Sequence, residues 1–133
     1  MIIRDYDRYD AEEILPLYAA VGWTNYTDRP DMLRQAFARA LMALAAYEDG
    51  APVGVLRAVG DGCSVVLIQD ILVRPEYQRQ GIGTALMREA LRRCEGVYQV
   101  QLMTDDMPGT VAFYRSLGFL DAAALGCRAF MRG

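Results

Sequence analysis

The sequence contains no lysine and no histidine, so all 14 of its positive charges are arginines. Without histidine, no serine or cysteine can be activated by an imidazole base, and no histidine metal cluster can form. Without lysine, Schiff-base chemistry and the lysine-containing phosphate loop are excluded as well. Proton transfer in this chain must therefore use carboxylates, tyrosines, cysteines or water.

Cysteine is scarce too. Cys63, Cys94 and Cys127 are widely spaced and odd in number, which predicts a reducing compartment with free, buried thiols. The N-terminus, MIIRDYDRYD, reaches acidic residues too early for a signal peptide. The longest apolar stretch, AFARALMALAAY, is interrupted by Arg39 and is too short to span a membrane. We therefore expect a soluble, cytoplasmic protein with no membrane partner and no metal site.

Length and charge narrow the class of protein further. The chain has 133 residues, of which 53% are hydrophobic and 23% charged, and this predicts a single globular domain over residues 1–133. The net charge of −3 argues against a nucleic-acid partner, because neutralising phosphates needs a basic face. The high apolar fraction is compatible with a homodimer.

Hydrophobic periodicity predicts the element order β-α-α-β-β-β-α-β-α-β, which is an α+β domain around a mixed sheet. Tight turns are expected at Asp49-Gly50 and at Gly60-Asp61-Gly62, and GWTNYTDRP is expected to be a loop. The expected elements are a strand at 2–4, helices at about 10–21 and 31–39, three strands within 41–73, a helix after the glycines at 81–83, a strand at 98–104, a helix at 111–117, and one or two strands between 119 and 130.

The stretch QRQGIG at residues 78–83 opens an apolar helix, and this position predicts an anion-binding site. A helix N-terminus leaves backbone N–H groups unpaired and positively polarised, and glycines let an anion approach them closely. A dinucleotide-binding loop fits poorly, because the third glycine is missing and RPEYQRQ separates the strand from the glycines. A tight turn between strand and helix is the alternative without a ligand.

Two motifs in order point to a known family. Gln78–Gly83 resembles the Q/R-x-x-G-x-G/A signature of the GCN5-related N-acetyltransferases (GNATs), and Phe113–Phe119 resembles their second signature, F/L-Y-x-x-x-G-F. The element order matches that family from about Ile2 to Phe130. The resemblance implies a GNAT-like mixed, mostly antiparallel sheet flanked by helices on both faces. It also implies acetyl-CoA as co-substrate and direct transfer of its acetyl group to a primary amine.

The resemblance assigns roles to particular positions. The backbone of the strand before the loop would pair with the pantetheine arm of coenzyme A, and Val73 N–H would hold the thioester oxygen. Tyr114 would protonate the departing thiolate or hold the sulfur, although it could instead share a buried helical face with Val111 and Leu117. The implied cofactor-binding residues are Ile71, Leu72, Val73, Gln78, Arg79, Gln80, Gly81, Ile82, Gly83 and Thr84.

Asp70 is the candidate general base. Strand alternation places Asp70 and Leu72 on one face and Ile71 with Val73 on the other. A structural aspartate that pairs with an arginine is an equal alternative. Glu48, Glu76 or a water chain could also accept the proton.

The resemblance also implies that the acceptor meets the loop between the first two helices, here through Trp23, Asn25 and Tyr26. Aromatic rings and an amide suit a small-molecule amine with an apolar body, although Trp23 could be a core residue. Two other functions stay open: acetylation of a protein N-terminus or lysine, and a non-catalytic coenzyme A sensor. Met107 stands where the family often has a cofactor-binding asparagine, with Asp105 and Asp106 just before it.

Overall fold

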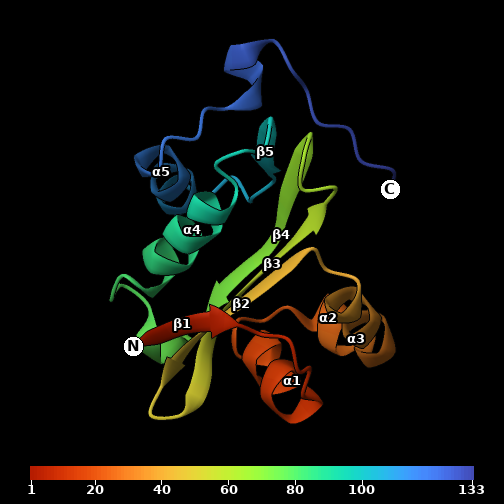
Figure 1. The fold of residues 1–133 in the computed structure, drawn as a ribbon, viewed down its shortest axis with the longest axis vertical. Helices are drawn as coiled ribbons and strands as arrows, with labels where there is room; N and C mark the ends of the chain where they lie inside the picture. Colours follow the sequence, from red (N-terminus) through yellow and green to blue (C-terminus); the bar gives the residue numbers. More distant parts are fainter. The chain divides into compact units, whose positions relative to one another are not determined.

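The computed structural model describes residues 1–133, and its five strands form one sheet in the order β1-β2-β3-β4-β5 (Figure 1). Neighbouring strands from β1 to β4 are antiparallel, whereas β4 and β5 are parallel, as the α+β prediction requires. The strands are β1 Ile2–Asp5, β2 Met42–Glu48, β3 Ala51–Gly60, β4 Val65–Val73 and β5 Gln99–Leu102.

The chain divides into two compact units, Met1–Met103 and Thr104–Gly133, which are described separately below. The prediction of a single domain stays a prediction. No helix is both long and apolar enough to cross a membrane. The helices are α1 Ala11–Ala20, α2 Thr24–Thr27, α3 Pro30–Ala38, α4 Ile82–Arg93 and α5 Pro108–Ser116, with short 3-10 turns η1 Pro75–Tyr77 and η2 Ala122–Leu125.

Helices cover both faces of the sheet in the first unit, with α1–α3 on one face and α4 on the other (Figure 1). On the first face, apolar side chains of α1 and α3 pack against Ala45, Val55 and Leu72. On the second, Gly54 allows α4 to lie close to β3, since a Cβ there would be 3.3 Å from the side chains of Ile82 and Leu86. The mixed sheet with helices on both faces is confirmed.

Local sequence signals account for several element boundaries. The Asp10 carboxylate accepts from the Glu12 N–H at 2.9 Å and so begins α1, as an N-cap does. Asp49 and Gly50 have φ values of 51° and 80°, which match the expected two-residue turn between β2 and β3. The region expected to be a loop contains one helical turn, α2, which the sequence analysis did not predict.

The sheet contains one irregularity that decides the direction of the side chains in β4. Arg57 pairs with Asp70, but the next pair along β3 is Ala58 with Ile68, so Gln69 is an extra residue without a partner. Such a β-bulge changes the alternation of side chains between the two faces. Ile68 lies on the α4 face of the sheet, and Asp70 lies on the α1–α3 face, as expected with Leu72.

Two predictions are wrong. No strand follows Leu102: Asp121 accepts from the Ala123 N–H and starts η2, and Gly126, in the left-handed region at φ 75°, ends it. An alanine-rich segment lacks the β-branched and aromatic residues that favour strands. The second error concerns the thiols, since Cys63 and Cys127 are exposed and Cys94 alone is buried.

Candidate active site

The edge of β4 that faces β5 is open along its second half. The parallel pairing of the two strands runs from Val65–Gln99 to Ile68–Leu102 and stops there, while β4 continues to Val73. Residues 70–73 of β4 therefore have a neighbour on the β3 side only, and the bulged Gln69 pairs with neither strand. An unpaired strand edge offers backbone groups to an extended ligand.

The direction of these backbone groups follows from the pairing with β3. The N–H of Arg74 donates to the carbonyl oxygen of Val53 at 2.8 Å, so residue 74 points toward β3. Because successive residues of an antiparallel strand point to opposite edges, the N–H groups of Ile71 and Val73 point toward the open edge. Leu72 points toward β3, so the geometry favours its two neighbours over Leu72 as backbone partners of a ligand.

The loop at residues 78–83 leaves the N-terminus of α4 without a side-chain cap, so its backbone N–H groups are available to an anion. Gly81 precedes the helix at φ 83°, and no side chain caps the free N–H groups of the first turn. Arg79 also has a positive φ, 64°, which is uncommon for a residue with a Cβ and is typical of functional loops. The Gln78 side chain donates to the Val73 carbonyl at 3.0 Å and so connects the loop to the open strand edge.

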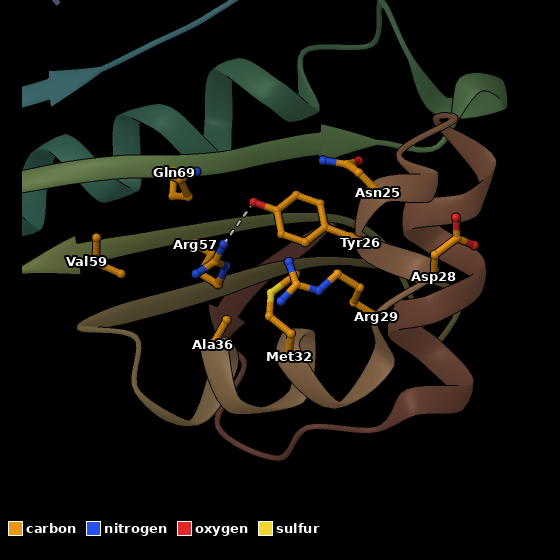
Figure 2. A pocket seen from close by; sticks show the side chains of 9 residues that line it. All are labelled: Asn25, Tyr26, Asp28, Arg29, Met32, Ala36, Arg57, Val59 and Gln69. Carbon is orange, nitrogen blue, oxygen red and sulfur yellow. Dashed lines mark hydrogen bonds between the residues drawn. The ribbon is translucent and has the colours of Figure 1, made fainter. Parts of the chain in front are cut away.

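A pocket of about 690 Å³ lies beside the bulge, on the α1–α3 face of the sheet (Figure 2). It is formed by α2, the start of α3 and the facing positions of β3 and β4. Asn25 and Tyr26, two of the three residues predicted to meet the acceptor, line this pocket. The full lining is Asn25, Tyr26, Asp28, Arg29, Met32, Ala36, Arg57, Val59 and Gln69.

Trp23 is placed differently from those two residues. Its ring packs edge-to-face on Tyr18 at 5.8 Å and tilted on Tyr26 at 6.2 Å, within the core cluster of the first unit. It does not line the pocket. The contacts favour the alternative that Trp23 is a core residue, one that supports Tyr26 from behind.

Behind the pocket, Asp70 is the centre of a buried polar network. Its side chain is 2% exposed and pairs with Arg57, which is 5% exposed, at 2.7 Å. Arg57 Nε also donates to Oδ2 of Asp70 at 2.8 Å. Two hydroxyls complete the network, from Tyr18 to Oδ2 and from Tyr26 to Oδ1, each at 2.9 Å. Both carboxylate oxygens therefore accept hydrogen bonds from the protein itself.

The two tyrosines of this network remain neutral under ordinary conditions. Burial raises the pKa of Tyr18, and the charge of Asp70 raises it further. Burial also raises the pKa of Tyr26, whose hydroxyl accepts from Arg57 at 3.3 Å and donates to Asp70. Tyr26 lines the pocket, and its hydroxyl is fixed by these two hydrogen bonds; Figure 2 shows the one with Arg57.

These contacts favour the ion-pair interpretation of Asp70 over the general base. A base must have an oxygen free to take a proton from the acceptor, and here both oxygens of Asp70 accept hydrogen bonds from the protein and Asp70 does not line the pocket. Glu48 pairs with the N-terminal ammonium and Glu76 with Arg74, and neither lines the pocket. Water is the remaining proton acceptor that the sequence analysis considered.

Tyr114 belongs to the second unit and is 9% exposed on α5. Within that unit its ring contacts Phe113 and Phe119 edge-to-face, at centroid distances of 5.0 and 6.1 Å. Burial raises its pKa, and the charge of Asp105 adds to this effect. A raised pKa keeps the hydroxyl protonated at neutral pH, as a proton donor requires.

Met107, the departure from the family pattern, immediately precedes α5. Its side chain is exposed, and its backbone N–H donates to the Asp105 carboxylate at 3.0 Å. Asp105 therefore shapes the start of α5, while the thioether provides no amide for a ligand. The contact that the family often makes through an asparagine has no equivalent side chain at this position.

The sequence analysis missed several residues of this site, above all Arg57. An arginine inside the otherwise apolar stretch APVGVLRAVG, with an aspartate in the next strand, was the available signal for a buried ion pair. Arg29, Met32 and Gln69 carry no comparable signal, because only the folded chain brings them to one pocket.

An uncapped helix N-terminus, an open strand edge and a pocket at the bulge together suit an extended anionic ligand beside a second, smaller one. Comparison with known proteins agrees. A family model described as the acetyltransferase (GNAT) family matches residues 8–119. The chain belongs to the GNAT acetyltransferase family.

Individual relatives extend the comparison. The chain is 32% identical over 130 residues to serotonin N-acetyltransferase 2, chloroplastic, from Oryza sativa subsp. japonica, covering 92% of this chain and 63% of that protein. It is 26% identical over 122 residues to GCN5-related N-acetyltransferase 1, chloroplastic, from Arabidopsis thaliana, covering 90% and 61% respectively. The chain thus spans less than two thirds of the length of these curated relatives.

Solved structures agree on the fold. A GNAT-family acetyltransferase from Streptococcus pneumoniae TIGR4 superposes with a TM-score of 0.90 at 44% identity, covering 98% of this chain and 96% of that one. An aminoglycoside 6'-N-acetyltransferase complexed with coenzyme A gives a TM-score of 0.71 at 22% identity, covering 80% and 63%. The second likeness supports the fold alone.

Proposed function

We propose that this chain transfers the acetyl group of acetyl-CoA directly to the primary amine of a small molecule. The observation that carries the proposal is the continuity of three features in Met1–Met103: the helix terminus at Gly81, the open edge of β4 and the pocket beside Gln69. At about 3.3 Å per residue, β4 from Arg74 back to Gln69 spans about 17 Å. This is a track for an extended arm that begins at the helix and ends at the pocket.

Different protein groups along this strand edge would bind different parts of acetyl-CoA. The free N–H groups at the start of α4 hold the pyrophosphate, with Arg79 adding positive charge. The N–H of Val73 holds the pantetheine arm. The N–H of Ile71 lies closer to the pocket, so we assign it, rather than Val73, to the developing oxyanion.

The proton balance follows from the groups that are free. The neutral amine attacks the thioester carbonyl carbon, the carbon–sulfur bond breaks, and the sulfur leaves as thiolate. We assign the proton of the attacking amine to water at the pocket, because Asp70 is already bonded by Arg57, Tyr18 and Tyr26. We assign Tyr114 as the group that protonates the thiolate; this role rests on the FYRSLGF motif.

The test is release of free coenzyme A thiol from acetyl-CoA in the presence of a panel of small primary amines. The proposal expects thiol release that depends on the amine and yields acetylated product by mass spectrometry. Release that does not depend on any amine, or labelling of the protein itself, would contradict direct transfer to a small molecule.

Two other functions remain to be separated from this one. Some relatives are named as protein-modifying enzymes, such as the histone acetyltransferase TAP1 of Glycine max, at 38% identity over 69 residues. A peptide acceptor predicts thiol release with peptides and none with small amines. A coenzyme A sensor predicts binding of acetyl-CoA without thiol release by any acceptor.

Gly81 offers a direct test of the cofactor site. We expect Gly81→Ala to weaken acetyl-CoA binding at least tenfold, because its new Cβ enters the space that the pyrophosphate needs. The left-handed φ of 83° should also cost about 1 kcal/mol of stability. Isothermal titration with acetyl-CoA and urea unfolding measure the two effects.

Gly50→Ala is the matched control. Gly50 has a φ of 80°, and a Cβ at either glycine would meet no atom within 4 Å. Both variants should therefore lose similar stability, while Gly50→Ala keeps the wild-type affinity for acetyl-CoA. Equal affinities in the two variants would contradict the placement of the pyrophosphate at Gly81.

We also propose a homodimer and a cytoplasmic location. The dimer is supported by large apolar side chains exposed in the second unit, where Leu120, Leu125, Phe130 and Met131 are 65–90% exposed. Sedimentation of the full chain measures its mass in solution, which should be twice the 14.8 kDa of one chain if it is a dimer. The location is supported by three free thiols.

A further inference from the structure

The charge of the pocket indicates which small amines it can accept. Two arginines line it, Arg29 and Arg57, against one carboxylate, Asp28. Arg57 is neutralised by its ion pair with Asp70 and also donates to Tyr26. Asp70 therefore compensates the charge of Arg57. The charged side chains of the pocket lining that have no ion-pair partner are Arg29 and Asp28.

These two side chains point in different directions. Figure 2 shows the Arg29 side chain extending across the pocket toward Tyr26 and Met32, whereas the Asp28 carboxylate points away from them. Among residues 1–103, no carboxylate forms an ion pair with Arg29; the nearby Asp31 pairs with Arg34 at 3.8 Å. Arg29 is thus a cation without a protein partner, directed into the pocket.

The guanidinium group suits one ligand chemistry in particular. It presents a planar fork of N–H donors that binds a carboxylate or a phosphate through two parallel hydrogen bonds. Next to Arg29, the apolar atoms of Met32, Ala36 and Val59 line the same space. This combination fits a molecule with a short apolar body and an anionic group. It is less suited to a polycation, since the one carboxylate in its lining, Asp28, points away from Arg29, Tyr26 and Met32.

We propose that the acceptor is a primary amine that also carries an anionic group, a carboxylate or a phosphate, and that Arg29 binds this group. The inference rests on the proposed function. The amine lies toward Gln69 and the open edge of β4, and the anion lies toward the start of α3. Arg29 acts in binding and specificity and takes no part in proton transfer.

The test compares three pairs of amines that differ by the anionic group: phenylalanine and phenethylamine, lysine and 1,5-diaminopentane, and phosphoethanolamine and ethanolamine. Thiol release gives kcat/KM for each. For at least one pair, the wild type should prefer the anionic member. Arg29→Gln should lower kcat/KM for that member about tenfold, mainly through KM, and leave kcat/KM for the partner without the anionic group unchanged. Comparing each ratio between wild type and variant removes differences in amine basicity.

Arg34→Gln is the control, since Arg34 is also exposed on α3 but does not line the pocket. It should leave every ratio unchanged. The first two pairs identify a carboxylate and the third a phosphate, and either result supports the anion. Preference for the member without the anionic group in every pair, or an equal loss for both members in Arg29→Gln, overturns this inference alone. No thiol release with any of the six amines overturns the proposed function together with it.

Discussion

Tyr114→Phe is expected to lower kcat about a hundredfold while the affinity for acetyl-CoA stays within about twofold of wild type. The reason is that the variant keeps the ring and its contacts with Phe113 and Phe119 and removes only the proton donor. Steady-state thiol release measures kcat, and titration with acetyl-CoA measures binding. Because burial raises the pKa of Tyr114, its hydroxyl is protonated throughout the neutral range in which the assay runs.

Tyr98→Phe is the matched control, because it removes a hydroxyl from a tyrosine that is 80% exposed. Its kcat should equal that of the wild type. An unchanged kcat in Tyr114→Phe would assign Tyr114 to the buried face of α5, the alternative that its helical spacing allowed. Loss of acetyl-CoA binding in Tyr114→Phe would instead indicate a role in holding the sulfur.

Asp70→Asn is expected to reduce the free energy of unfolding by about 3–5 kcal/mol, because it leaves the charge of Arg57 buried without a counterion. Urea denaturation measures the change. Replacing both partners, in Arg57→Met with Asp70→Leu, should cost less than the single change, since no buried charge remains. A double variant as unstable as the sum of its single variants would contradict the ion-pair account.

The same variant separates the ion pair from a general base. If Asp70 took the proton from the acceptor, Asp70→Asn would strongly lower kcat of the folded enzyme with little loss of stability. The acid limb of the profile of kcat/KM against pH would then be the same for every amine. With water as the proton acceptor, that limb should instead follow the pKa of the amine itself and move when a less basic amine is used. Profiles for two amines of different basicity decide between these outcomes.

Most elements of the fold could be predicted from local signals. The alternation of apolar residues predicted strands β2 to β4, Asp10 predicted the start of α1, and the glycines before Ile82 predicted the start of α4. These signals act over a few residues, so they can be read without knowing the partner strand or helix.

The bulge at Gln69 could not be predicted in this way. It is a property of the register between β3 and β4, and the register depends on which residues of two separate segments pair. The strand alternation placed Asp70 on the same face as Leu72 correctly. No local signal indicated that Ile68 would point to the other face or that the pocket would lie beside the extra residue.

In the candidate site, too, local features could be predicted from the sequence, whereas contacts between distant segments could not. The anion-binding helix start was inferred from the glycine motif, and the acceptor contact of Asn25 and Tyr26 from the family resemblance; both residues line the pocket. The network of Asp70 with Arg57 and Tyr18 joins β4 to β3 and α1, which are distant in the chain. The expectation of strands after residue 119 was read from hydrophobic periodicity, and it failed because the local sequence favours a turn at Asp121.

The central claim is that the start of α4 and the open edge of β4 bind acetyl-CoA. Thermal unfolding of the chain with acetyl-CoA, NAD and ATP in parallel tests it most directly, because a ligand that binds only the folded state raises the midpoint. At 100 times its dissociation constant, acetyl-CoA should stabilise the fold by about 2.7 kcal/mol and raise the midpoint by about 10 °C. NAD and ATP should leave it nearly unchanged. An unchanged midpoint at millimolar acetyl-CoA would contradict the claim and, with it, the proposed acetyl transfer.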